Sequence, residues 1–159
     1  MYASRLDLRD EIRNESIAHL QARLSDALDL GAQLKQAHWN VKGRDFFQLH
    51  KLFGRIHGEV DGYVDTLAER ITTLGGVADG RIATTATDTG LNPYPLQARD
   101  GEAHLKAVAR ALSQFGGAVR QDVDAATAVG DADTADVFTE ISRGTDKQLW
   151  FVEAHLTGD

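Results

Sequence analysis

Cysteine is absent from this 159-residue chain, and its absence removes several classes of chemistry at once. Without thiolates there are no disulfides, no iron–sulfur clusters, no zinc–thiolate sites and no cysteine nucleophiles. Long apolar runs are missing too, so we expect no membrane-spanning segment. The N-terminal sequence MYASRLDLRDEIRNES is polar and of mixed charge, without the apolar core of a secretory signal. These absences favour a cytoplasmic location.

Basic residues are also fewer than acidic residues. The formal net charge is −7, from 24 acidic and 17 basic residues. An acidic chain repels phosphate backbones and attracts cations, so the charge disfavours nucleic-acid binding and favours metal handling. Six histidines accompany the 24 carboxylates. In the absence of thiolates, these ligand types suit iron, manganese or zinc.

Proline occurs only as Pro93 and Pro95, and the long stretches outside this pair have apolar residues at helical spacing. The spacing predicts four helices, at about 17–38, 45–74, 100–130 and from 133 or 134 to 156. For their ends we expect the cap residues that favour helix termini: Asp7 or Asp10 for the first helix, Asp100 for the third, and glycines at 75, 76 and 130.

The polar stretch between the second and third predicted helices, residues 76–99, is long for a structureless connection. We therefore expect it to cross the molecule and to carry a short helix. A short turn, a long crossover and a second short turn over four helices are typical of ferritin-like four-helix bundles. The predicted fold class is thus all-α, as a single ferritin-like domain over 1–159 with an N-terminal tail of about 1–7.

The second predicted helix has a row of potential metal ligands beside its apolar face. At about 100° per residue, one side collects His50, Gly54, His57, Asp61, Asp65 and Glu69. His38 adds another imidazole, because it continues the apolar face of the first helix. A lone histidine on such a face is more often a hydrogen-bonded core residue, but His38 and His50 flank one tight turn, which brings two antiparallel helices close together.

His50 and Glu69 cannot bind one ion within a single chain. They lie nineteen residues apart on one helix, which corresponds to about 28 Å of rise. Antiparallel pairing with a second copy, about a twofold axis near residue 58, places His50 opposite the segment 65–69 of the partner. Each dimer then contains two identical sites built from both chains.

Three glycines on this helix, Gly54, Gly58 and Gly62, recur every four residues. Glycine inside a helix costs about 1 kcal/mol relative to alanine, so we interpret the repeat as a place where a partner backbone approaches closely. The alternative is that the glycines are tolerated on an exposed face. No Glu-x-x-His pair occurs in the sequence, which argues against a di-iron site within one bundle.

Several sequence motifs together resemble the Dps family of miniferritins, the DNA-protection proteins of starved cells. The matching segments are AHWNVKG (37–43), FxxLHxLF (46–53), VDTLAERITTLGG (64–76) and GDADTADVFTEISRGTDKQLWFVEAHL (130–156). The resemblance implies a homo-oligomeric shell of twelve ferritin-like subunits. It also implies ferroxidase activity, in which Fe(II) is oxidised at twofold interfaces, preferentially by hydrogen peroxide, and ferric oxide is stored inside, with a role in oxidative stress.

The resemblance also assigns residues to this chemistry. Carried over by motif, His38 and His50 come from one chain, and Asp65 and Glu69 come from its partner. Trp39 corresponds to the family's tryptophan beside the site, where it relays or quenches electrons; its alternative role is packing. DNA-binding members often use lysine-rich tails, and this acidic chain lacks one, so we expect little DNA binding at physiological salt.

One position departs from the family pattern. Four residues after its second histidine the family usually has an aspartate, and here Gly54 occupies that place. The candidates for the missing ligand are His57, one turn further on, and His155 near the C-terminus. More imidazole and less carboxylate would suit zinc better and ferric iron less well. The alternative functions are therefore a DNA-compacting shell, or a zinc- or manganese-binding shell with weak ferroxidase activity.

Three acidic residues surround the start of the fourth predicted helix: Asp131, Asp133 and Asp136. By resemblance they line a pore through which iron enters the shell. Their alternative role is helix capping, because carboxylates favour helix N-termini, and we expect at least one of them to be a cap.

Overall fold

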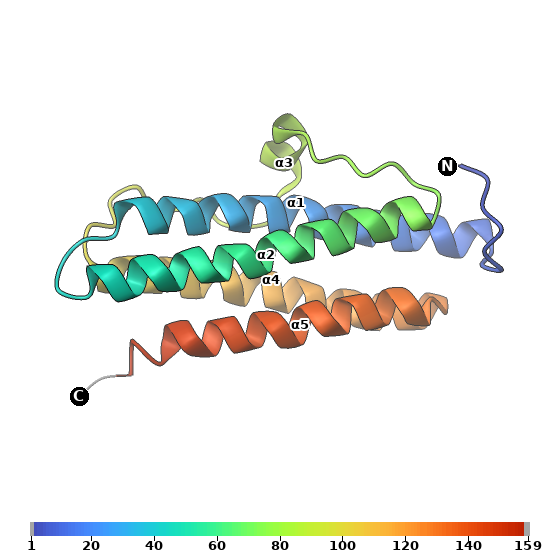
Figure 1. Cartoon of the computed structure of the whole chain (residues 1–159). Helices are drawn as coiled ribbons and strands as arrows, with labels where there is room; N and C mark the ends of the chain where they lie inside the picture. Colours follow the sequence, from blue (N-terminus) through green and yellow to red (C-terminus); the bar gives the residue numbers. More distant parts are fainter. Residues whose placement is uncertain (1, 158–159) are drawn as a thin grey trace.

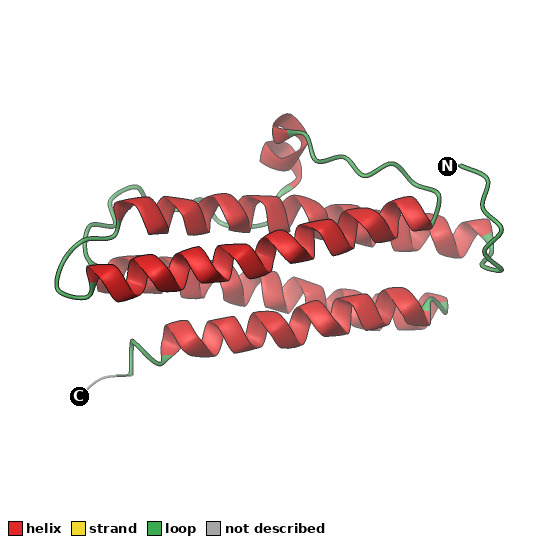
Figure 2. Ribbon diagram, viewed as in Figure 1, coloured by secondary structure: helices red, strands yellow, loops and turns green. Residues whose placement is uncertain are grey.

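Four long helices account for most of the computed structural model, which describes residues 2–157. They are α1 (Asp10–Asn40), α2 (Phe46–Thr73), α4 (Gly101–Val129) and α5 (Ala132–Glu153), with the short α3 (Ile82–Asp88) between α2 and α4. The described residues contain no strand (Figure 2). The predicted all-α class is confirmed, as is the short helix in the crossover. Residues 1, 158 and 159 of the predicted domain lie outside the described residues.

The helices form two antiparallel pairs, α1 with α2 and α4 with α5 (Figure 1). A turn of five residues joins α1 to α2, and an even shorter turn joins α4 to α5. Between the pairs, the crossover returns the chain along the length of the bundle and places α3 against the outer side of α1. This is the predicted ferritin-like connectivity, and no helix in the described part is long and apolar enough to span a membrane.

The core lies where the apolar faces of the four long helices meet. Its largest fully buried side chains are Phe53, Phe115 and Phe138, surrounded by leucines and isoleucines from α1 and α2. Each such side chain contributes about 1.5–3 kcal/mol through its removal from water. Near the C-terminal end, Val137, Leu149 and Leu156 pack against this core while remaining partly exposed.

Most predicted helix ends are confirmed. Asp100 caps α4 by accepting a hydrogen bond from the backbone N–H of Ala103 at 2.8 Å. Gly130 ends the same helix in the left-handed region, with φ of 89°, a conformation that glycine adopts without a steric penalty. Gly75 has the same φ immediately after α2.

The predicted cap of α1 is wrong. Arg9 occupies the N-cap position and makes no side-chain cap hydrogen bond. Asp7 precedes this position, and Asp10 is already within the helix, where its carboxylate pairs with Arg13 one turn further on. Arg13 also donates to the carbonyl of Leu74 at 3.2 Å, so the start of α1 is tied to the end of α2 instead of being capped locally.

At the start of α5, Asp131 is the expected capping residue. It accepts hydrogen bonds from the backbone N–H and the hydroxyl of Thr134, at 3.1 and 2.6 Å, and pairs with Arg70 at 2.8 Å. Its side chain is only 1% exposed. Although burial opposes its ionisation, the hydrogen bonds from Thr134 and the charge of Arg70 lower the pKa of Asp131. The other two carboxylates of this predicted pore group, Asp133 and Asp136, are exposed, and their role in a pore stays a prediction.

Candidate metal centre

His38 and His50 face each other across the turn that joins α1 to α2, as the sequence predicted. Their imidazole rings stack with centroids 3.7 Å apart and an interplanar angle of 21°. Nδ1 of His38 lies 2.7 Å from the carbonyl oxygen of His50, and Nδ1 of His50 lies 2.8 Å from the carbonyl oxygen of His38. The two residues are therefore locked together by reciprocal hydrogen bonds.

These hydrogen bonds fix the tautomer of both rings. A carbonyl oxygen accepts only, so each Nδ1 must carry the proton and donate it. In a neutral imidazole, the other nitrogen, Nε2, then keeps its lone pair. A backbone hydrogen bond at one ring nitrogen is the usual way in which a metal-ligating histidine is oriented through the other. Both rings are half-buried, and Phe46 tilts against His50 at 5.3 Å.

Gly54 lies directly against this histidine pair. A Cβ atom at position 54 would come within 3.1 Å of both Nδ1 and Cε1 of His38, closer than ordinary van der Waals contact. The ring of His38 thus occupies space that a side chain at position 54 would need. The position of the His38 ring therefore requires a residue without a side chain at position 54, and this is the position at which the family carboxylate is missing.

The other two glycines of the repeat have a different environment. A Cβ atom at Gly58 or Gly62 would meet nothing within 4 Å among the described residues. At Gly54 the close neighbour within the chain is His38. Close packing of all three glycines against a partner stays a prediction.

Asp65 and Glu69 lie on α2, exposed, and further along the same helix as His50. A straight helix separates His50 from Asp65 by about 22 Å. Within residues 2–157, no three histidine, aspartate or glutamate side chains of one chain are placed to hold a metal ion. The single chain therefore brings His38 and His50 together and keeps Asp65 and Glu69 apart from them.

His57 and Trp39 line a mostly apolar groove of about 220 Å³ between α1 and α2, together with Lys35 and Asp61. The His57 ring packs on Gly31, with Nδ1 3.5 Å from the position of an added Cβ. Burial and the positive charge of Lys35 lower the pKa of His57, although Asp61 has the opposite effect. The His57 ring is therefore neutral at physiological pH. Trp39 is 67% exposed, so this tryptophan is available to a partner or to solvent.

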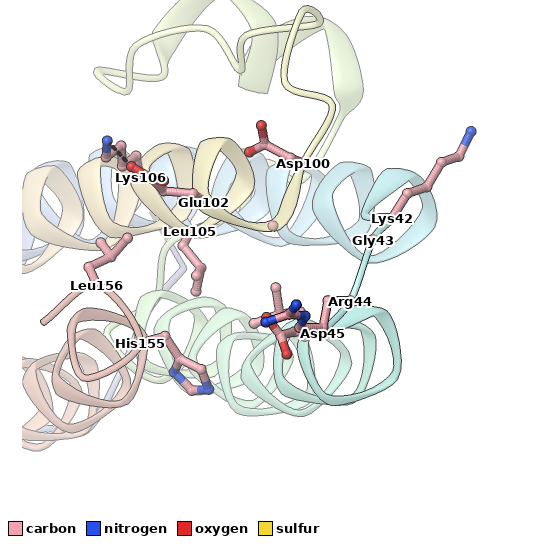
Figure 3. A pocket seen from close by; sticks show the side chains of 12 residues that line it. Lys42, Gly43, Arg44, Asp45, Asp100, Glu102, Leu105, Lys106, His155 and Leu156 are labelled. Carbon is pink, nitrogen blue, oxygen red and sulfur yellow. Dashed lines mark hydrogen bonds and ion pairs between the residues drawn. The ribbon is translucent and has the colours of Figure 1, made fainter. Parts of the chain in front are cut away.

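His155 lies elsewhere, at the end of the bundle. It lines a cavity of about 580 Å³ between the α1–α2 turn, the start of α4 and the end of α5 (Figure 3). Its Nδ1 donates to the carbonyl of Phe151 at 2.7 Å. The same cavity has three basic and three acidic residues on its wall: Lys42, Arg44, Lys106, Asp45, Asp100 and Glu102.

Two buried polar groups were not singled out from the sequence. Asp122 on α4 pairs with His19 at 2.8 Å and with Arg23 at 3.3 Å, and burial raises its pKa. Its spacing three residues after Val119 places this carboxylate on the apolar face of α4, which was a visible signal. The second group, Tyr94 with His104, had no such signal, because the crossover brings the two together only in the folded chain.

The connectivity and the histidine pair place this chain in the ferritin-like class. Residues 17–158 match the ferritin-like domain family. The DNA protection during starvation protein of Agrobacterium fabrum is 37% identical over 150 residues, which cover 94% of this chain and 93% of that protein.

Solved structures show the same similarity. DpsC from Streptomyces coelicolor has a TM-score of 0.93 at 29% identity, with 100% of this chain and 92% of that chain covered. Dps from Microbacterium arborescens, in its high iron form, has a TM-score of 0.89 at 31% identity, with 96% and 99% covered. The chain belongs to the Dps family of miniferritins, as its motifs predicted.

Proposed function

We propose that this protein is a ferroxidase that oxidises Fe(II), preferentially with hydrogen peroxide, at sites shared by two subunits. The ferric product is stored as oxide inside a hollow homo-oligomeric shell, a dodecamer by family resemblance, and this protects against oxidative stress. The observation that carries the proposal is the His38–His50 pair, whose reciprocal hydrogen bonds leave both Nε2 lone pairs free for a metal.

The remaining ligands come from a second subunit in this proposal. An antiparallel pairing of two α2 helices about an axis near Gly58 brings Asp65 and Glu69 of the partner subunit to the histidine pair. Both carboxylates are exposed on the single chain, as a shared site requires. Two imidazoles and two carboxylates form a donor set that suits ferrous iron and also zinc.

Ferrous iron is the substrate of this reaction, and the site's own residues hold it and orient it. A pair of ferrous ions supplies both electrons that reduce one hydrogen peroxide molecule to water. Trp39 follows His38 in the sequence and is 67% exposed, and in this proposal it passes or absorbs single electrons. The excess of carboxylates, with a net charge of −7, favours the accumulation of cations. The similar Dps from Microbacterium arborescens has been solved in a high iron form, which supports iron as the cargo.

The zinc-binding alternative has one observation in its favour. Because Gly54 cannot coordinate and His38 fills the space beside it, the centre has one carboxylate fewer than the family pattern. A zinc-binding shell with weak ferroxidase activity would follow from this donor set, because imidazole suits zinc, whereas manganese prefers carboxylates. A DNA-compacting shell is disfavoured by the charge of the chain.

Iron oxidation separates these functions. We expect anaerobic protein loaded with Fe(II) to oxidise it rapidly on addition of peroxide, as followed by ultraviolet absorbance, and more slowly with dioxygen. We expect no retarded band in a DNA gel-shift at physiological salt. Stoichiometric zinc binding without peroxide-driven oxidation would replace the ferroxidase proposal by the zinc alternative, and a retarded band would support DNA compaction.

Two histidines compete for the ligand role that Gly54 cannot fill. We propose His57, which lines the same groove as Trp39, the residue that follows His38 in the sequence. His155 lines a separate cavity and is the weaker candidate. We expect His57→Ala to weaken zinc and ferrous-ion binding about tenfold, or 1.4 kcal/mol, in calorimetry.

The matched control is His155→Ala, which we expect to bind both ions like wild type. If His57→Ala also binds like wild type, the centre works with His38, His50, Asp65, Glu69 and water. A loss of affinity confined to His155→Ala would reverse the ranking of the two histidines.

A further inference from the structure

Tyr94 and His104 form a hydrogen-bonded pair inside the molecule that the proposed iron chemistry does not use. The Tyr94 hydroxyl lies 2.5 Å from Nδ1 of His104, with the two rings inclined by 25° and their centroids 6.1 Å apart. Tyr94 comes from the crossover, between Pro93 and Pro95, and His104 lies in the first turn of α4. His104 is only 1% exposed, so the contact is shielded from water.

The protonation states at this contact follow from its surroundings. Burial raises the pKa of Tyr94 to about 12, so its hydroxyl is protonated at physiological pH. Burial lowers the pKa of His104, against the opposing effects of the Asn40 backbone and the carboxylate of Asp100, so its ring is neutral. The hydroxyl is therefore the donor and Nδ1 of His104 the acceptor.

A phenol hydrogen-bonded to a neutral imidazole is arranged for coupled loss of an electron and a proton. Removing one electron from a phenol makes its O–H strongly acidic, and a base already within hydrogen-bond distance receives the proton as the electron leaves. Here the proton would move from the Tyr94 oxygen to Nδ1 of His104. The negative charge of Asp100 then stabilises the imidazolium that results.

The pair also lies near the candidate metal centre in the folded chain. Gly101, in the same first turn of α4 as His104, packs against Leu49, which directly precedes His50 in α2. We propose that Tyr94 and His104 form a redox-active pair that traps one-electron oxidants produced beside the iron site. This inference rests on the proposed function for its physiological oxidant, but the chemistry of the pair is independent of iron.

The trapping step transfers one electron and one proton. A hydroxyl radical, formed when a single ferrous ion reduces hydrogen peroxide, takes one electron from Tyr94 and becomes hydroxide. The Tyr94 O–H bond breaks, its proton binds Nδ1 of His104, and a neutral tyrosyl radical remains. A ferrous ion then returns an electron to the radical and becomes ferric, and the proton moves back from His104 to the tyrosine oxygen.

The chain contains a matched control for this tyrosine. Of its three tyrosines, Tyr2 is 70% exposed, and Tyr63 is half-buried with a pKa also raised to about 12. The Tyr63 hydroxyl lies against Gly144 on α5, near the carboxylates of Glu59 and Glu140 instead of a histidine. Tyr63 thus shares the raised pKa of Tyr94, but within the described residues its hydroxyl makes no hydrogen bond to a histidine.

The first test uses metal-free, full-length protein and azide radicals generated by pulse radiolysis. We expect wild type and Tyr63→Phe to give a long-lived tyrosyl radical, detected by its absorbance and by electron paramagnetic resonance. Tyr94→Phe should lose most of this signal. In His104→Gln, formation of the Tyr94 radical should slow by about tenfold or more, because the proton acceptor is gone.

The second test uses Fe(II) and peroxide with a spin trap, where Tyr94→Phe should release several-fold more hydroxyl radical than Tyr63→Phe. Equal radical yields in Tyr94→Phe and wild type in the azide experiment would overturn the proposal, as would loss of the signal in Tyr63→Phe. Because that experiment contains no iron, its outcome is independent of whether the protein oxidises iron. Tyr94→Phe removes a single hydroxyl, so it keeps the test valid if His104→Gln fails to fold.

Discussion

A mixture of two inactive variants should recover activity. We expect His50→Ala and Asp65→Ala each to abolish peroxide-driven iron oxidation, because each removes one ligand from both sites of a dimer. After the two variants are unfolded together and refolded, half of the dimers are hybrids, and each hybrid contains one intact site. Activity should therefore recover to about one quarter of the wild-type value at equal amounts.

The refolded single variants serve as controls and should stay inactive. A second control mixes His50→Ala with His38→Ala. In a hybrid dimer of these variants, one site lacks His50 and the other lacks His38, so this mixture should recover no activity. Recovery in that control, or none with Asp65→Ala, would show that the ligands are not divided between chains as proposed. If His50→Ala and Asp65→Ala each oxidise iron like wild type, these residues are not the ligands.

Arg70→Met should lower the free energy of unfolding by about 3 kcal/mol. Asp131 is 1% exposed, and Arg70 supplies its counter-charge at 2.8 Å, so the substitution leaves a buried carboxylate without its partner. The measurement is urea unfolding at one fixed protein concentration, since assembly also contributes to apparent stability. The matched control is Arg120→Met, whose pair with Asp146 is about half exposed and should contribute less than about 1 kcal/mol.

The destabilisation caused by Arg70→Met should decrease as the pH falls. Because Arg70 helps to hold the pKa of Asp131 below its ordinary value of 3.8, its stabilising effect is fully present above that value. It is lost as the pH falls through the folded-state pKa and Asp131 becomes protonated. If Arg70→Met lowers the free energy of unfolding no more than Arg120→Met does, the Thr134 hydrogen bonds alone stabilise the Asp131 carboxylate.

The fold was predictable because its determinants are local and periodic. Apolar residues at steps of three and four located each long helix, and Asp100, Gly75 and Gly130 marked ends that depend on short-range backbone chemistry. The cap of α1 was not predictable in this way. Asp10 pairs with Arg13, and Arg13 donates to the carbonyl of Leu74, sixty-one residues away. This tertiary contact, which the local sequence does not reveal, determines the conformation at the start of α1.

The meeting of His38 and His50 was predictable from the sequence, but its geometry was not. The turn between two helices indicated that His38 and His50 would meet, and helix rise indicated that Asp65 and Glu69 would not join them in one chain. The reciprocal bonds to backbone carbonyls depend on how closely α1 approaches α2. The same approach explains Gly54, whose missing side chain makes room for the ring of His38 in a way that helix spacing alone cannot reveal.

The ligand set of the bound metal tests the central proposal most directly. We would grow crystals of the assembled protein with Fe(II) under anaerobic conditions, and with zinc, and locate each metal by its anomalous scattering. The proposal predicts metal bound by Nε2 of His38 and His50 from one subunit and by the carboxylates of Asp65 and Glu69 from its twofold partner. Metal held by ligands of one chain only, or absent from the histidine pair while bound elsewhere, would contradict it.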